Sequence, residues 1–280
     1  MTSHLTPKRE RWLLLTLASI QFTSVLDFMI MMPLGPQLTE LFGISAGEFG
    51  FLVSAYTFAA GLSGLLAATY IDRFGRKRMM LTLYPLFGAA ALACSFAPTF
   101  AWLMVARVAS GFFGGVLMAL SQTIVAEVIP FERRGRAMGV VMTSFSVATV
   151  AGVPLALFLA SHFNWHAPFL AIALMVSVCA LGAAKTLPSL KGHLAAHPVG
   201  DSAPNMLANL RLVLVDPNHL RAYAMSASMV FAGFAVIPYI ALYLQGNAGF
   251  KPEQVPYVYL TGGICTLISA RFIGHWSDRA

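Results

Sequence analysis

The chain has 280 residues, of which 58% are hydrophobic and 10% are charged, with a formal net charge of +7. Soluble domains are about 25% charged and need polar surface to face water, so this composition excludes a soluble globular protein. A disordered chain would be poor in apolar residues and rich in charge, and is excluded as well. The composition therefore indicates a protein whose solvent is lipid.

Eight apolar stretches are long enough to cross a bilayer, which takes about 20 residues. In chain order they cover residues 12–34, 49–70, 79–97, 101–125, 137–160, 167–187, 221–244 and 255–275. Glycine, proline and clustered charges mark the breaks between them, as expected of turns. Residues 188–220 form a longer polar segment, in which apolar residues from Met206 to Leu214 have the spacing of a short amphipathic surface helix.

Basic residues are distributed unevenly among the segments that join these stretches. Sixteen of them lie in alternate segments, starting with the N-terminus, and one, Lys251, lies in the others. Cytoplasmic loops carry the excess of Lys and Arg, so we expect both the N-terminus and residue 280 on the cytoplasmic side of the membrane. The positive charge is thereby assigned to membrane topology, and no nucleic-acid partner is expected.

Enzymatic and metal-binding chemistry find little support in the sequence. The seven histidines lie in loops or at the ends of apolar stretches, and the three cysteines lie inside apolar runs. Neither an HExxH nor a GxSxG motif occurs. We therefore expect no enzyme, no metal and no cofactor.

One short motif recurs along the chain. Asp72-Arg73 follows the second stretch and Asp278-Arg279 follows the eighth, 206 residues later, with small residues at matching positions before each pair. Parallel repeats of this kind are typical of secondary transporters, although two Asp-Arg pairs can also coincide by chance. If the repeat is real, a complete second copy would end at roughly residue 390–400, and the chain stops within that copy.

Several motifs resemble those of the major facilitator superfamily. The segment ATYIDRFGRKR at 68–78 resembles the cytoplasmic loop signature between the second and third helices, and Arg107 with Gly111 resembles the fourth-helix signature. The run at 139–154, which closes on Gly-Val-Pro, resembles the fifth-helix antiporter signature, with Ala148 where a glycine is usual.

Two further motifs resemble the 12-span drug/proton antiporter branch of that superfamily. They are Leu26-Asp27 followed by Pro33, in the first stretch, and PFERRGRAMG at 130–139, in the loop after the fourth. The resemblance implies an all-α membrane bundle of the major facilitator type, with eight of an expected twelve helices. Its parts would be a six-helix bundle (1–187), a cytoplasmic linker (188–220) and the first two helices of a second bundle (221–280).

The function implied by the resemblance is secondary active transport. A monomer in a bacterial inner membrane would export a small organic compound in exchange for protons, by alternating access between its two halves. Two alternatives remain open at this point: a uniporter or symporter of the same fold, and a membrane sensor or scaffold that transports nothing.

Asp27 is the only acidic residue well inside a predicted span, and Arg107 is the only deeply placed basic one. Helical rise places both at about the same depth, and a charge at that depth has to face the bundle interior or a wet cavity. We expect Asp27 to carry the coupled proton and Arg107 to tune it or bind substrate. A static structural ion pair is the alternative. Weaker candidates for the cavity lining are Gln21, Tyr56, Gln122 and Tyr239.

Two sets of residues are expected to serve the conformational change. The loop motif and its repeat would clamp one conformation through Asp72, Arg73, Gly75, Arg76, Asp278 and Arg279, although its basic residues also suit simple anchors on the cytoplasmic side. Small residues at spacing four on the fifth and eighth stretches would let two helices slide past each other, and tight packing within one bundle is the alternative. The packing residues singled out are Gly111, Ala148, Gly152, Pro154 (a predicted kink), Gly262 and Gly274.

Overall fold

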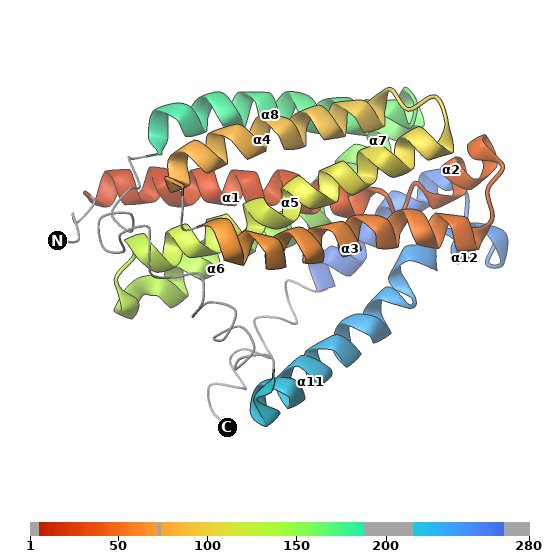
Figure 1. The fold of residues 1–280 in the computed structure, drawn as a ribbon. Coiled ribbons are helices and arrows are strands. Elements are labelled where there is room, and N and C mark those ends of the chain that lie inside the picture. The colour runs from red at the N-terminus through yellow and green to blue at the C-terminus, as the bar shows by residue number, and fades with distance from the viewer. Residues whose placement is uncertain (1–5, 72–73, 188–214, 266–280) are drawn as a thin grey trace.

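A computed structural model of the chain describes all residues except 1–5, 72–73, 188–214 and 266–280. Every regular element in the described part is helical, and most of the helices run side by side (Figure 1). In chain order the elements are α1 (Pro7–Ile30), α2 (Gly35–Phe42), α3 (Ala46–Tyr70), α4 (Arg76–Ser95), α5 (Phe100–Val128), α6 (Phe131–Val147), η2 (Ala148–Gly152), α7 (Val153–His162), α8 (His166–Thr186), α11 (Pro217–Phe234), η3 (Ile237–Tyr239), α12 (Ile240–Gly246) and η4 (Pro252–Gln254).

Within the described residues, seven helical segments are long and apolar enough to cross a membrane. They are Pro7–Ile30, Ala46–Ala67, Arg76–Ser95, Phe100–Val128, Phe131–His162, His166–Thr186 and Pro217–Gly246. These segments correspond to the first seven predicted stretches and confirm the predicted helical membrane fold. Of the eighth stretch, residues 255–265 are helical and the remainder lies outside the described residues.

Two boundaries differ from the prediction. The turn predicted at Gly35-Pro36 is the start of α2, because a proline in the first turn of a helix needs no N–H partner. The seventh span begins inside the predicted linker, at Pro217, where the Asp216 carboxylate accepts hydrogen bonds from two backbone N–H groups and caps α11. The predicted amphipathic helix of the linker lies outside the described residues.

Helix α11 stands apart from the main bundle along most of its length (Figure 1). None of its residues is buried, and it reaches the bundle at its C-terminal end, where the Phe234 ring lies 5.6 Å from the Phe28 ring of α1. The Tyr239 hydroxyl of η3 lies close to Gly50 near the N-terminal end of α3, and the helix α12 that follows packs against α2.

The tightest helix crossing joins α3 and α5, and three glycines of α5 make it possible. A Cβ atom at Gly111 would lie 2.3 Å from the Tyr56 carbonyl oxygen, and one at Gly115 would lie 2.3 Å from the Ala60 carbonyl oxygen. A Cβ at Gly114 would lie 2.8 Å from the Tyr56 hydroxyl. Small residues at spacing four let two backbones approach in this way in membrane helices.

The fifth span consists of α6 and α7 joined by a π-helical turn, η2. The Val153 N–H donates to the carbonyl of Ala148, five residues back, and Pro154 follows with no N–H to donate. A kink was predicted at Pro154, and the structure has the π-helical turn η2 just before that residue.

The small residues of the fifth span face α1. The Ser144 hydroxyl donates to the Ala18 carbonyl at 2.7 Å, and a Cβ at Gly152 would lie 2.9 Å from Leu26 Cδ1. Ala148, which lies between Ser144 and Gly152 in the sequence, is fully buried. In the described structure this part of the stripe packs against α1, and its role as a sliding surface stays a prediction.

The contact between the fifth and eighth spans uses neighbouring residues instead. A Cβ at Gly263 would lie 2.9 Å from Val150 Cγ2, whereas a Cβ at Gly262 would meet no described atom within 4 Å. Gly263 is therefore a residue of the eighth span that packs against the fifth, and a packing role of Gly262 stays a prediction. Gly274 lies outside the described residues.

Two basic residues of the loop motif are structural. The Arg76 side chain is buried, and its Nε lies 3.2 Å from both carboxylate oxygens of Glu127 at the end of α5. The Lys77 ammonium donates to the Leu187 carbonyl at 2.6 Å and to that of Ala184, at the C-terminal end of α8. Arg76 and Lys77 therefore join the N-terminal end of α4 to the C-terminal ends of α5 and α8.

Replacing Glu127 by glutamine is expected to lower the free energy of unfolding by about 1.5–3 kcal/mol, the range for a hydrogen bond to a charged group. The buried guanidinium of Arg76 would keep its position and lose its ion pair with Glu127. Thermal denaturation in detergent would measure the loss, with Glu132→Gln, an exposed residue in the first turn of α6, as the matched control. Equal stability of the two variants would contradict the expectation.

Candidate functional site

Asp27 of α1 and Arg107 of α5 meet in the middle of the bundle. Arg107 Nη1 donates to Asp27 Oδ2 at 2.9 Å and to the Asp27 carbonyl oxygen at 3.1 Å. Both side chains are 0% exposed. Each residue was singled out from the sequence for its charge and depth, and the structure brings the two into direct contact.

An aromatic side chain covers the pair. The Arg107 guanidinium carbon lies 4.4 Å from the centre of the Tyr56 ring, a cation–π distance. Tyr56 is held by its hydroxyl, which donates to the Ser24 carbonyl at 3.4 Å, and by the Phe28 ring at 5.2 Å. Because Phe28 also touches the end of α11, the site is in contact with the first helix beyond the linker.

Hydrogen-bonding capacity at the pair is only partly used. Asp27 Oδ1, Arg107 Nε and Arg107 Nη2 are buried and have no hydrogen-bond partner among the described residues, and the same is true of Gln21 Oε1 further along α1. Buried polar atoms are nearly always paired in folded proteins, so each of these needs a reason. The carboxylate oxygen could accept a proton, and the two guanidinium nitrogens beside it could donate to a hydrogen-bond acceptor.

The other candidates from the sequence do not gather at the pair. Gln122 is exposed on α5, and Tyr239 packs on α3 at Gly50. Gly75 is the N-cap of α4, with a φ of −63° that any residue adopts. The remaining loop residues, Asp72, Arg73, Asp278 and Arg279, lie outside the described residues.

Several residues near the pair were not predicted. Ser24 lies three residues before Asp27, on the same face of α1, and that helical spacing was the available signal. Ser110 and Cys94 are buried with their Oγ and Sγ atoms 3.9 Å apart, Ser110 being one turn after Arg107. Phe28 and Phe234 gave no signal in the sequence, because apolar residues are common throughout these helices.

Residues 17–280 match the Major Facilitator Superfamily. The chain belongs to this family of membrane proteins, as the bundle and the buried ion pair at its centre lead one to expect. The resemblance found in the sequence motifs is thereby confirmed.

Two relatives illustrate the similarity. The chain is 27% identical over 266 residues to the uncharacterized MFS-type transporter YtbD of Bacillus subtilis (strain 168), covering 95% of this chain and 65% of the relative. It is 29% identical over 255 residues to the purine ribonucleoside efflux pump NepI of Salmonella typhimurium (strain LT2), covering 91% of this chain and 62% of the relative. The chain thus spans less than two thirds of the length of these relatives.

Solved structures agree on the fold. A bacterial homolog of the human lysosomal transporter Spinster, in an inward-facing and unoccupied conformation, superposes with a TM-score of 0.75 at 17% identity, over 99% of this chain and 65% of that one. A D-xylose-proton symporter superposes with a TM-score of 0.75 at 16% identity, over 98% of this chain and 70% of that one. At these identities the likeness is one of fold.

Proposed function

We propose that the chain forms part of a secondary active transporter that exports a small organic compound in exchange for protons, with Asp27 as the proton-carrying group. The observation that carries this proposal is the Asp27–Arg107 pair, fully buried and with unpaired atoms on both partners. Ionisable residues are costly inside a membrane bundle and mark ion pathways and proton relays.

Protonation offers a physical link between the proton and the substrate. The unpaired Oδ1 of Asp27 is a hydrogen-bond acceptor while the carboxylate is charged, and a hydroxyl or N–H group of the substrate would donate to it. A proton on Asp27 would occupy that oxygen and cancel the charge that attracts the donor. Proton and substrate would therefore exclude each other at one site, as exchange requires.

Alternating access is proposed from the arrangement of the helices around the pair. The first six spans form the bundle that holds Asp27 and Arg107, and α11, the first helix after the linker, touches Phe28 beside them. Rocking of the second half against the first would open this contact to one side of the membrane and then to the other. The membrane of this proposal is the bacterial inner membrane, and the protein acts as a monomer.

Purine ribonucleosides are the first substrates to test, because a 29% identical relative is a purine ribonucleoside efflux pump. Their ring nitrogens and hydroxyl oxygens are acceptors that suit the unpaired N–H groups of Arg107. Drugs and sugars of similar size form the second panel, since the same fold carries many substrates.

The test is uptake of labelled nucleoside into inverted membrane vesicles with an acidic interior. The unaltered protein is expected to concentrate the substrate, and Asp27→Asn is expected to let it equilibrate without concentrating it. Glu40→Gln, which removes an exposed carboxylate from α2, is the matched control and should behave as the unaltered protein.

Other outcomes identify the alternatives. Concentration by Asp27→Asn under the same gradient would rule out proton coupling through this residue. Accumulation only with an acidic exterior would mean symport, equilibration without any dependence on pH would mean a uniporter, and absence of flux for every compound would favour a sensor or scaffold.

A further inference from the structure

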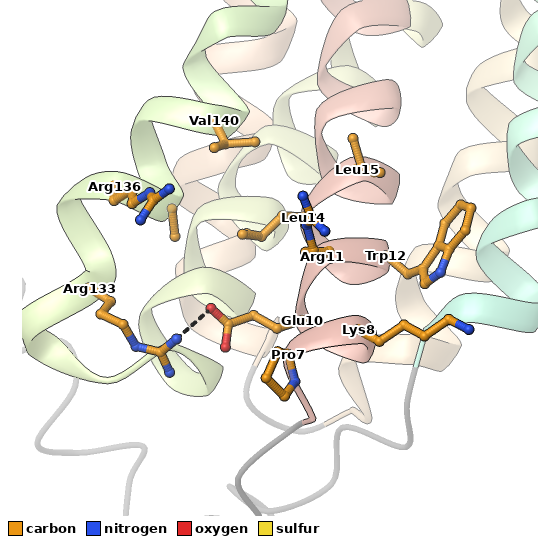
Figure 2. A pocket seen from close by; sticks show the side chains of 11 residues that line it. Pro7, Lys8, Glu10, Arg11, Trp12, Leu14, Leu15, Arg133, Arg136 and Val140 are labelled. Atoms are coloured by element: carbon orange, nitrogen blue, oxygen red, sulfur yellow. Dashed lines mark hydrogen bonds and ion pairs between the residues drawn. The ribbon is translucent and has the colours of Figure 1, made fainter.

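A cavity lies far from the Asp27–Arg107 pair, at the N-terminal end of α1. It occupies about 840 Å³ between the first turns of α1 and of α6, and eleven side chains line it. Figure 2 shows the two helices on either side, joined by one ion pair, Arg133 Nη1 to Glu10 Oε1 at 3.0 Å. The residues that line this cavity include neither Asp27 nor Arg107.

The mouth of the cavity is strongly basic. Lys8 and Arg11 of α1 and Arg133 and Arg136 of α6 line it, against a single carboxylate, Glu10. Glu10 is already engaged by Arg133, and within the described part of the chain the other three basic side chains form no ion pair. Three exposed positive charges from two helices therefore surround one space without counter-charge, which predicts an anionic occupant.

The inner part of the cavity is apolar and accessible. Leu15 and Val140 line it and keep 53% and 38% of their surface exposed, and Trp12, which is 52% exposed, lies between them and the basic mouth along α1. Figure 2 shows Leu15 and Val140 further along the helices than Glu10 and Arg133. From Lys8 to Leu15 the α1 backbone rises about 10 Å, enough to pass through a lipid headgroup layer of about 5–7 Å and reach the acyl chains.

We propose that this cavity, lined by Lys8, Arg11, Trp12, Leu15, Arg136 and Val140, binds an anionic phospholipid of the adjacent leaflet. The lipid phosphate would lie between Arg11 and Arg136, with the Trp12 ring at the level of the headgroups, where aromatic residues favour the interface. One acyl chain would cover the exposed surfaces of Leu15 and Val140. A soluble anion would satisfy the charges and leave that apolar surface in water, which is why a lipid fits better.

The test measures binding of phosphatidylglycerol to the delipidated protein by native mass spectrometry, with phosphatidylcholine as the zwitterionic comparison. The double variant Arg11→Gln/Arg136→Gln is expected to weaken phosphatidylglycerol binding at least about tenfold, whereas Arg9→Gln/Arg78→Gln should stay within about twofold. The second pair removes the same charge from exposed residues that do not line the cavity, so it controls for net charge. Matching melting temperatures would show that both variants fold.

Trp12 gives an independent readout inside the intact protein. Brominated phosphatidylglycerol should quench its fluorescence, measured as the difference from Trp12→Phe, and Arg11→Gln/Arg136→Gln should remove most of that quenching. Three results would overturn the proposal: equal weakening by both double variants (diffuse surface charge), equal binding of phosphatidylcholine (no recognition of the anion), or displacement of the lipid by inorganic phosphate at similar concentration (a soluble-anion site).

Discussion

The variant Arg107→Met is expected to lose about 3–5 kcal/mol of unfolding free energy, the cost of leaving one partner of a buried ion pair behind. The uncompensated group would be Asp27, which is 0% exposed and receives its side-chain hydrogen bond from Arg107. Methionine fills most of the space of the arginine stem, so the loss reports on charge more than on packing. Thermal or denaturant unfolding in detergent would measure it.

The double variant Asp27→Asn/Arg107→Met is expected to regain most of that stability, because removing both charges of a buried pair is often close to neutral. Arg78→Met, an exposed arginine at the start of α4, is the matched control and should change stability little. A double variant as unstable as Arg107→Met would contradict the coupling of the two residues. The same variants in vesicles would separate stability from transport, since the double variant should fold and fail to couple to protons.

Adding a single methyl group at the α3–α5 crossing is expected to destabilise the protein nearly as much. Gly111→Ala and Gly115→Ala place a Cβ 2.3 Å from a backbone carbonyl oxygen of α3, and a backbone yields less readily than a flexible side chain. Each variant should lose about 3 kcal/mol, the upper end of the usual range for overpacking.

Gly61→Ala is the matched control for this series. Gly61 lies on α3 itself, and a Cβ there would meet no described atom within 4 Å. Alanine is the better helix former, so this variant should be unchanged or gain about 0.5–1 kcal/mol. Loss of stability in Gly61→Ala equal to that in Gly111→Ala would mean that the crossing is not as close as described. Gly111→Ala should also impair transport, because Tyr56, the residue it displaces, covers Arg107.

The spans and the depth of the charged residues were predictable because each depends on local sequence. Length and apolar content identify a membrane helix without reference to any neighbour. The depth of Asp27 and Arg107 follows from helical rise alone. Two opposite charges at the same depth are expected to pair, because an unpaired charge inside the membrane is costly. That is why the pair could be anticipated from residues 80 positions apart.

Contacts that depend on which neighbour a helix face meets were harder to predict. The stripe that includes Ser144 and Gly152 indicates close packing, but spacing alone does not say whether α1 or the eighth span is the partner. In the sequence, Arg76 looks like one more basic loop residue. Its partner Glu127 is 51 positions away, and only the fold brings the two side chains together. Such long-range choices depend on tertiary packing, and local patterns carry little information about them.

The π-helical turn in the fifth span also sets the rotational phase of that helix. In an unbroken α-helix, residues at spacing four drift by about 40° per step, so Ala156 and Ala160 would lie about 120° and 160° around from Ser144. The extra residue of η2 takes back about 100° of this drift, and all three residues are at most 5% exposed. Deleting one residue within 148–152 would therefore give a plain α-helix in which Ala156 and Ala160 keep their present phase. A plain α-helix formed by the unshortened sequence would instead turn the outer part of the stripe about 100° away from its partner while leaving the inner part in place.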